Sequence, residues 1–451
     1  MEIKQFEDKN MAHFSYAIVS HGEMALIDPS RDPQPYYKYA NETNSKITTV
    51  IETHPHADFV SSHLEIHLAT GATIYASKLL GAEYPHQTFD DGDAIVLGNS
   101  TLKAMNTPGH SPDSISILAM DENGKQEAVF TGDTLFIGDC GRPDLREQAG
   151  ALTATRVELA KQMYHSLREK IITLDDDALV FPAHGAGSLC GKNLSMDVSS
   201  TIGKEKKNNW SLQKATEEEF VETLNADQPF IPKYFTFNVG LNKKGADNYA
   251  DSISKVEKRE PVSCNGCAKS LNKEFVIIDT RSAEQFNKSH LKNSINLMND
   301  TKFETWLGSI LNWDEKFYLS AENEATLNEL IGRIAKIGYE KNIRGAFVQL
   351  YGDVHENVFN AEELIKNEGA FTIVDIRNPS EVAGQKIFSN SVNIPLYELR
   401  ERAKEIPLQK PIVIHCAGGY RSAAGKSIVN AIVGEAQTVS DLSVSVKDFY
   451  Q

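Results

Sequence analysis

One seven-residue pattern occurs twice in the second half of this chain of 451 residues. The segment FVIIDTR at residues 275–281 recurs as FTIVDIR at residues 371–377, so the two copies are offset by 96 residues. In each copy a polar segment, a second short apolar run and a helix-patterned stretch follow. Strands that alternate with helices predict a parallel α/β sheet. We therefore expect two tandem domains, at residues 256–350 and 352–451, each large enough to fold alone.

The first 200 residues follow a different pattern. Apolar runs typical of strands alternate with helix-patterned stretches, notably at residues 60–69 and 155–170. The strand-like runs lie at residues 14–19, 24–27, 48–51, 94–97, 114–118, 128–130 and 179–181. This mixture predicts an α/β sandwich with mixed sheets. The whole chain, with 451 residues, is too long for one core, so it should contain further domains. Residues 203–260 look like a peripheral extension and a linker, so we place the first domain at residues 1–242, with its core at 1–200.

The composition argues against several classes of function. The net charge is −16, and so acidic a surface would repel nucleic-acid phosphates. No apolar run approaches the length of a membrane span, and the polar first ten residues lack the apolar stretch of a secretory signal. The five cysteines are scattered and odd in number, which does not indicate a disulfide framework. We expect a cytoplasmic protein with free thiols that binds neither nucleic acid nor a membrane.

Histidine and aspartate lie at four predicted strand ends. They occur in THPHADF at residues 53–59, in TPGH at 107–110, in FTGD at 130–133 and in FPAH at 181–184. The side chains concerned are His54, His56, Asp58, His110, Asp133 and His184. Imidazole and carboxylate groups that meet at one sheet edge are typical metal ligands. A single histidine of this kind would indicate only a hydrogen-bonded residue, whereas the four segments together predict a metal site.

In order and spacing, these residues resemble the metallo-β-lactamase superfamily over about residues 1–200, and the resemblance implies an αββα sandwich. The hydrolases of that family usually have a histidine directly after the aspartate of the first motif, where it helps to hold a second metal. Here that residue is Phe59, and an apolar ring cannot ligate. The pattern therefore resembles the persulfide dioxygenases, a subgroup of mononuclear non-haem iron enzymes.

The resemblance implies one Fe(II) per chain. The implied ligands are His54, His110 and Asp133. Two imidazoles and one carboxylate on one face of an octahedron leave positions open for substrate and O₂. The residues implied to orient the ligands or the substrate are His56, Asp58 and His184. Arg142, in the run GDCGRPD at residues 138–144, is expected to bind the carboxylate of a thiol carrier, with a surface salt bridge as the alternative.

The second repeat has a cysteine directly after a predicted strand, in IVIHCAGGYRS at residues 412–422. A loop that turns from this strand into a helix surrounds the Cys416 sulfur with inward-pointing backbone N–H groups. These amides and Arg421 favour a thiolate and any anionic group attached to it, while Gly418 and Gly419 permit the tight curvature. The loop resembles the active-site loop of rhodaneses, and the resemblance covers about residues 352–451. It implies that Cys416 carries a transferable sulfur as a persulfide.

The first repeat lacks these groups. The offset of 96 residues places Ser320 opposite Cys416 and Ala325 opposite Arg421. This copy has no thiol, no arginine and two carboxylates where an anion would bind. We expect it to be a catalytically inactive rhodanese-like domain that serves as a spacer or a docking surface.

The other four cysteines give weaker signals. Cys264 and Cys267 have the spacing of half a zinc site, but no second pair follows. Exposed linker thiols are therefore favoured over a metal or redox function. Structural packing is favoured for Cys140 and Cys190, although Cys190 follows His184 closely in the sequence.

Together these patterns predict a persulfide dioxygenase fused to an inactive and an active rhodanese domain. The expected reaction oxidises a low-molecular-weight thiol persulfide, such as glutathione persulfide, with O₂ to sulfite. Cys416 would then join sulfur to sulfite to give thiosulfate, and the chain would clear sulfide-derived persulfides. Two alternatives stay open: a thioester hydrolase of the glyoxalase II kind with a zinc or mixed-metal site, and a non-catalytic sulfur carrier or sensor. The identity of the thiol carrier and the formation of a homo-oligomer also stay open.

Overall fold

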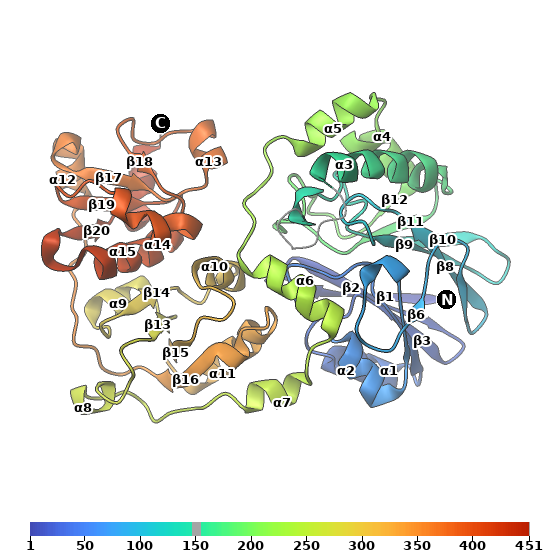
Figure 1. Cartoon of the computed structure of the whole chain (residues 1–451), viewed down its shortest axis with the longest axis horizontal. Coiled ribbons are helices and arrows are strands. Elements are labelled where there is room, and N and C mark those ends of the chain that lie inside the picture. Colours follow the sequence, from blue (N-terminus) through green and yellow to red (C-terminus); the bar gives the residue numbers. More distant parts are fainter. Residues whose placement is uncertain (147–154, 451) are drawn as a thin grey trace. The chain divides into compact units, whose positions relative to one another are not determined.

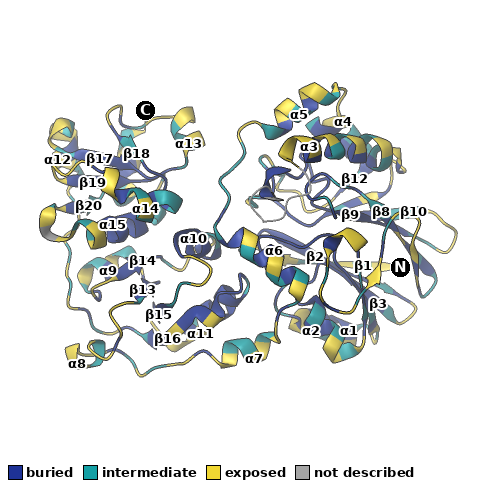
Figure 2. Ribbon diagram, viewed as in Figure 1, coloured by how far each residue is buried: buried dark blue, intermediate teal, exposed yellow. Residues whose placement is uncertain are grey.

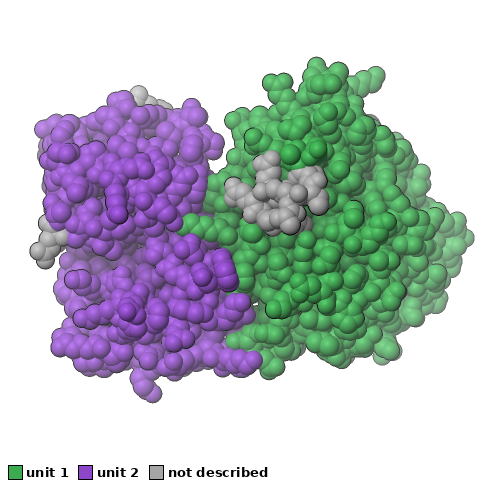
Figure 3. Space-filling view, viewed as in Figure 1, with its two compact units in different colours: residues 1–252, 335–338 green, residues 253–334, 339–451 purple. Residues whose placement is uncertain are grey.

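The computed structural model describes residues 1–146 and 155–450, and Figure 1 shows the course of the chain. The chain divides into two compact units, which Figure 3 colours separately. The first unit contains residues 1–252 with 335–338, and the second contains residues 253–334 with 339–451. Within the described residues, no helix is both long enough and apolar enough to cross a membrane.

Two six-stranded sheets form the first unit. One has the order β1-β2-β3-β4-β5-β6 and the other has the order β12-β11-β10-β9-β8-β7. The strands of the first sheet are β1 (Glu2–Asp8), β2 (His13–Ser20), β3 (Glu23–Ile27), β4 (Lys46–Ile51), β5 (Thr73–Ala76) and β6 (Gln87–Thr88). Those of the second are β7 (Ala94–Leu97), β8 (Ser100–Asn106), β9 (Ile115–Met120), β10 (Gln126–Gly132), β11 (Leu179–Pro182) and β12 (Ser200–Thr201). Both sheets contain parallel and antiparallel pairs, as predicted.

The alternation of side chains along each strand explains why the two sheets pack face to face. In β2, Tyr16 and Ile18 lie in one core with Phe130 of the second sheet, whereas Ala17 faces the helices on the outer side. The helices α1 (Gln34–Glu42) and α2 (His63–Thr70) cover the first sheet. The helices α3 (Arg156–His165) and α5 (Glu217–Asn225) cover the second sheet. The predicted αββα sandwich is therefore confirmed, and its strands are largely dark blue in Figure 2.

The structure contains strands that apolar runs did not indicate. Strand β8 has the sequence STLKAMN, whose polar residues alternate with buried ones and hide its strand character. The segment after the sandwich also forms more structure than an extension and linker would, with α4 (Ile202–Asn208), α6 (Tyr234–Lys244) and α7 (Tyr249–Ser254) besides α5. It is less peripheral than expected, because Ile202 and Phe220 belong to the core behind the second sheet.

Each repeat in the second unit forms a four-stranded parallel sheet, as predicted. The strand orders are β14-β13-β15-β16 and β18-β17-β19-β20. The first repeat contains α8 (Asn265–Ala268), β13 (Val276–Asp279), α9 (Ala283–Lys288), β14 (Ser294–Asn296), α10 (Phe303–Ile310), β15 (Phe317–Ala321), α11 (Glu324–Ala335) and β16 (Ile343–Val348). The second contains α12 (Ala361–Lys366), β17 (Thr372–Asp375), α13 (Pro379–Gly384), β18 (Val392–Asn393), α14 (Leu399–Arg402), β19 (Ile412–His415), α15 (Tyr420–Val433) and β20 (Val439–Asp441).

The strand register corrects one expectation about the repeats. Asp279 of β13 pairs with Ser320, whereas Asp375 of β17 pairs with His415. Ser320 therefore corresponds to His415 and not to Cys416. The residue at the position of the cysteine is Ala321, because the first repeat is one residue longer between these two strands.

Candidate metal centre and cysteine site

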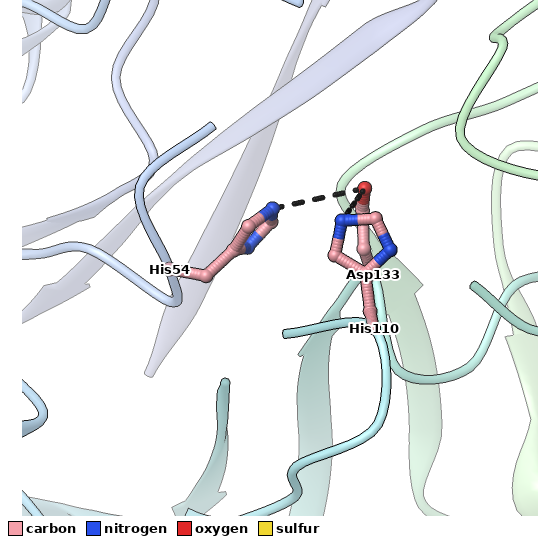
Figure 4. Close-up of side chains that lie close together, drawn as sticks. All are labelled: His54, His110 and Asp133. Carbon is pink, nitrogen blue, oxygen red and sulfur yellow. Dashed lines mark ion pairs between the residues drawn. The ribbon is translucent and has the colours of Figure 1, made fainter. Parts of the chain in front are cut away.

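Three residues of the first unit bring potential metal ligands to one point. His54 follows β4, His110 follows the loop after β8, and Asp133 comes directly after β10 (Figure 4). All three are buried, and one ligand atom of each lies within 4.8 Å of the others. The end of β10 reaches this point through Gly132, whose φ is +51° and where a Cβ would lie 2.7 Å from Thr53 Oγ1. A glycine is required there for the close approach.

The geometry of these three residues fits a metal ion. Asp133 Oδ2 lies 3.8 Å from His54 Nε2 and 3.5 Å from His110 Nε2. Oδ2 is buried, and within the described part of the chain no hydrogen-bond partner reaches it. Burial alone would raise the pKa of Asp133, but the nearby His184 and His110 imidazoles hold it well below its usual range. A buried carboxylate oxygen faced by two imidazole nitrogens is the arrangement that a bound cation would stabilise.

Hydrogen bonds to the other ring nitrogens fix the orientation of both imidazoles. Nδ1 of His110 lies 2.9 Å from the carbonyl oxygen of Arg142, which can only accept a hydrogen bond. Nδ1 of His54 lies 3.0 Å from Thr53 Oγ1, and that hydroxyl donates to Asp28 over 2.7 Å. In both rings Nδ1 therefore donates, which leaves the lone pair of Nε2 directed toward Asp133. The chain holds both rings in the tautomer that can ligate a metal.

The three residues expected to orient the ligands also lie together. His184 Nε2 is 2.8 Å from Asp58 Oδ2, and His184 Nδ1 is 2.7 Å from Asp133 Oδ1. His56, Asp58 and His184 form a second buried group of potential ligands. Phe59 lies beside this group, with its ring centre 4.4 Å from that of His56. An apolar ring therefore packs against this group.

Arg142 has different partners from those expected. Its guanidinium pairs with both oxygens of Asp144, over 2.7 Å each, and also donates to the carbonyl oxygens of Leu189 and Pro229. The residue is only 1% exposed. The guanidinium is therefore engaged within the chain, and the Arg142 carbonyl group accepts from His110. The contact of Arg142 with a carrier carboxylate stays a prediction.

The two buried cysteines of the first unit differ in their surroundings. Cys140 lies in the core behind the second sheet, which agrees with the favoured structural role. Cys190 lies within reach of Asp133 and His184, and the three form a further group of potential ligands. Burial raises the pKa of the Cys190 thiol well above its usual value, and the nearby Asp58 and Asp133 carboxylates add to this effect.

The loop after β19 surrounds Cys416, which is 1% exposed. The Gly419 N–H donates to Cys416 Sγ over 3.1 Å, and the sulfur lies 3.6 Å from Ser422 Oγ. Gly419 has a φ of +101°, and a Cβ there would lie 3.1 Å from the backbone nitrogen of Val444. The loop conformation therefore requires this glycine. Gly418, by contrast, is exposed and has open space around it.

Arg421 is held by residues that the sequence did not indicate. Both of its terminal nitrogens pair with Glu381 of α13, over 2.6 and 2.7 Å. Burial alone would lower the pKa of Arg421, but Glu381 and Cys416 raise it above its usual value. The guanidinium carbon also lies 5.6 Å from the ring centre of Trp306, which belongs to the first repeat. Neither Glu381 nor Trp306 is close to Arg421 in the sequence. The sequence around Glu381 indicates only a capping box at the N-terminus of α13, which Glu381 completes.

The sequence matches two families of known proteins. Residues 9–184 match the metallo-beta-lactamase superfamily. Residues 266–347 and 360–451 each match the rhodanese-like domain, which makes the repeat a tandem of such domains.

Individual relatives give the same result. The chain is 31% identical over 228 residues to "Persulfide dioxygenase ETHE1, mitochondrial" of Bos taurus, covering 49% of this chain and 79% of that protein. The chain covers 59% of the length of the human protein of that name. It is 30% identical over 259 residues to "Hydroxyacylglutathione hydrolase cytoplasmic" of Arabidopsis thaliana, covering 56% of this chain and 88% of that protein.

One solved structure is similar over most of the chain. It is a metallo-beta-lactamase from Staphylococcus aureus, with a TM-score of 0.69 and 34% identity. The match covers 77% of this chain and 99% of the Staphylococcus aureus chain. The chain belongs to the metallo-β-lactamase superfamily, is homologous to persulfide dioxygenase ETHE1, and continues into tandem rhodanese-like domains.

Proposed function

We propose that this chain is a persulfide dioxygenase with a single non-haem iron, coupled to sulfur transfer by Cys416. The observation that carries the proposal is the buried group of His54, His110 and Asp133, in which two oriented Nε2 atoms face one carboxylate oxygen. Two imidazoles and one carboxylate are the ligand set typical of non-haem Fe(II) oxygenases. The similarity to persulfide dioxygenases supports the same assignment.

Fe(II) bound by these three residues would supply the activation of O₂. The protein contributes the positions and protonation states of the ligands. Thr53 and the Arg142 carbonyl group hold the two imidazoles in the ligating tautomer. His184 fixes the orientation of the Asp133 carboxylate by its contact with Oδ1. The substrate we propose is a low-molecular-weight thiol persulfide, RSSH. It reacts with O₂ and water to give RSH, sulfite and two protons, so that sulfite receives two oxygens from O₂ and one from water.

The second group of potential ligands supports this proposal over its main rival. A hydrolase of the hydroxyacylglutathione kind is nearly as similar in sequence, and such chemistry uses a metal-activated water. Here His184 is engaged between Asp58 and Asp133, and Phe59 packs against His56. With a hydrocarbon ring in place of a ligand, this group is poorly equipped to hold a second metal. The arrangement therefore favours one metal and the oxidation of a persulfide.

The rhodanese-like half supplies the second proposed step. Sulfane sulfur on Cys416, held as a persulfide, is attacked by sulfite, which gives thiosulfate and returns the Cys416 thiolate. The Gly419 amide and Arg421 stabilise negative charge on this sulfur. The product of the first reaction is thus the acceptor of the second.

The test combines metal analysis with O₂ uptake on glutathione persulfide. The purified full chain should retain about one iron per chain and consume O₂ together with the persulfide. Asp133→Ala should lose both the iron and the O₂ uptake. Asp197→Ala removes an exposed carboxylate instead and should change neither. Two zinc ions per chain, with hydrolysis of a glutathione thioester and no O₂ uptake, would establish the hydrolase in place of the dioxygenase.

A further inference from the structure

We propose that Cys264 and Cys267 form a redox-active dithiol that reacts with the S–S bond of a low-molecular-weight disulfide or persulfide. This site is separate from the iron ligands and from Cys416, and it does not depend on the proposed dioxygenase activity. The two sulfurs lie 2.6 Å apart as free thiols. The Cys267 N–H also donates to Cys264 Sγ over 3.2 Å. Two thiols in such contact can close a disulfide with little movement of the backbone.

The pair is anchored, unlike thiols on a loose linker. Residues just before it run beside the sheet edge, where the Arg259 N–H donates to Ala346 and the Val262 N–H donates to Val348, over 2.8 and 2.9 Å. Cys267 itself packs against a core cluster that contains Val262 and Leu271. The contact between the sulfurs is therefore part of the folded repeat.

A pocket of about 400 Å³ adjoins Cys267. Apolar side chains of Val262 and Leu271 form part of its lining, Arg259 adds a positive charge, and Glu257 and Glu260 add two carboxylates. The Arg259 Nε donates to Glu257 over 2.9 Å, and its guanidinium lies 5.5 Å from the ring centre of Tyr318. Small thiol compounds of the cell carry carboxylates, which a guanidinium binds well. A disulfide or persulfide that carries a carboxylate would thus be held with its S–S bond beside Cys267.

Cys267 lines this pocket and is therefore the attacking group in the proposal. Hydrogen bonds from Cys264 and from the backbone of Ser263 lower the pKa of Cys267 below its usual value. Burial has the opposite effect on Cys140 and Cys190, whose pKa it raises. Because the thiolate is the reactive form, Cys267 is the better nucleophile of the three near neutral pH.

The reaction balances with the disulfide or persulfide as the oxidant. The Cys267 thiolate attacks the R-bearing sulfur of R–S–S–X, where X is a second R group or hydrogen, and forms the mixed disulfide Cys267–S–S–R. The S–S bond of the reagent breaks, and its other sulfur leaves as XS⁻, which is a thiolate RS⁻ or hydrosulfide HS⁻. Cys264 then attacks the Cys267 sulfur, closes the intramolecular disulfide and releases RS⁻. The two cysteines lose two electrons and two protons. The S–S bond of the reagent is reduced by the same two electrons.

Mass spectrometry of the full-length protein tests this directly. Trypsin releases residues 260–269 as one peptide that contains both cysteines, so the disulfide appears as a loss of two hydrogens. Oxidised glutathione and glutathione persulfide, used separately, distinguish the two sources of the S–S bond. In wild type, either reagent should close the disulfide, and a reduced dithiol should reopen it. Cys264→Ser should instead accumulate the glutathione adduct on Cys267.

Two matched changes separate the proposal from general thiol reactivity. Arg259→Ala should slow the reaction with oxidised glutathione about tenfold, which corresponds to one charge-assisted contact. It should leave the reaction with the uncharged 2-hydroxyethyl disulfide unchanged. Adducts on both cysteines without an intramolecular disulfide in wild type would overturn the proposal. So would zinc that remains bound to the purified protein and blocks both thiols.

Discussion

The two rhodanese-like repeats share a scaffold and differ in one loop. In both, the aspartate at the end of the first strand forms a buried pair with the arginine two residues later, over 2.6 Å, in Asp279–Arg281 and Asp375–Arg377. In both, an asparagine donates to the carbonyl oxygen of that aspartate, Asn296 in one copy and Asn393 in the other. These contacts hold the strand ends together in both copies, with or without the cysteine.

The loop beyond the third strand is where the copies diverge. Three residues lie between Ser320 and α11, whereas four lie between His415 and α15. The longer loop includes Gly419 in a left-handed conformation, and this turn aims its amide at the cysteine sulfur. The shorter loop lacks a glycine and cannot follow the same path. The first repeat therefore lacks both the cysteine and the glycine turn whose backbone amide contacts the cysteine sulfur in the second repeat.

The first repeat nevertheless contacts the cysteine loop of the second. The Tyr420 hydroxyl donates to the carbonyl oxygen of Met298 over 3.2 Å, and Trp306 lies against Arg421. Arg400 adds a bidentate pair with Glu315, over 2.7 and 2.8 Å. The first repeat is therefore more than a spacer, because it supplies one wall beside the sulfur-carrying loop.

The largest expected effect comes from making the active loop resemble the inactive one. Cys416→Ser should reduce sulfur transfer from thiosulfate at least about a thousandfold, since a hydroxyl is a poor nucleophile and forms no persulfide. O₂ uptake on glutathione persulfide should stay unchanged, and sulfite should accumulate in place of thiosulfate. The ratio of the two products measures this. An unchanged thiosulfate yield would show that the two activities are not coupled through Cys416.

A smaller effect is expected from the wall that the first repeat contributes. Trp306→Ala should raise the KM for thiosulfate about two- to fivefold through loss of the cation–π contact with Arg421, with a smaller change in kcat. Trp306→Phe keeps an aromatic face and should restore most of the affinity. Trp313→Ala, at an exposed position of the same repeat, is the matched control. A fall in kcat at constant KM in Trp306→Ala would point to a role other than steadying Arg421.

The third strands also differ in their neighbours. Ile414 of β19 pairs with Asp441 of β20, where the first repeat pairs Leu319 with Ala346. Burial raises the pKa of Asp441 to about 6, although hydrogen bonds from Ser422 and Ser443 oppose this. The folded state therefore binds the proton more tightly than the unfolded chain, so stability falls as the pH rises from about 4 through 6.

Asp441→Asn should remove this dependence. Relative to wild type, the variant should gain about 1 kcal/mol of unfolding free energy at pH 7.5 and little at pH 4. Urea unfolding at both pH values measures the difference. Asp448→Asn changes an exposed carboxylate nearby and should be neutral. A constant offset between Asp441→Asn and wild type at all pH values would contradict the raised pKa.

Much of the fold could be predicted because buried strands are apolar. The runs at 48–51, 128–130 and 179–181 all lie within observed strands, and the segments after them carry His54, Asp133 and His184, which the structure brings together. The one-residue register shift could not be seen, because the extra residue of the first repeat falls in segments without an apolar pattern. The Trp306–Arg421 contact and the contact between the Cys264 and Cys267 sulfurs depend on packing, which residue spacing alone does not report.

The smallest effect is expected from restoring a thiol to the inactive repeat. Ala321→Cys places a cysteine at the register position of Cys416, and Ser320→Cys, one residue earlier, is the matched control. When either change is combined with Cys416→Ser, sulfur transfer should stay at the background rate of Cys416→Ser alone. The reason is that the shorter loop offers no amide turn and no arginine, while Glu322 adds negative charge nearby. Persulfide on residue 321 should be absent by mass spectrometry after treatment with thiosulfate. Measurable turnover by Ala321→Cys would mean that the scaffold alone supports sulfur transfer and that the glycine-containing loop matters less than its thiol.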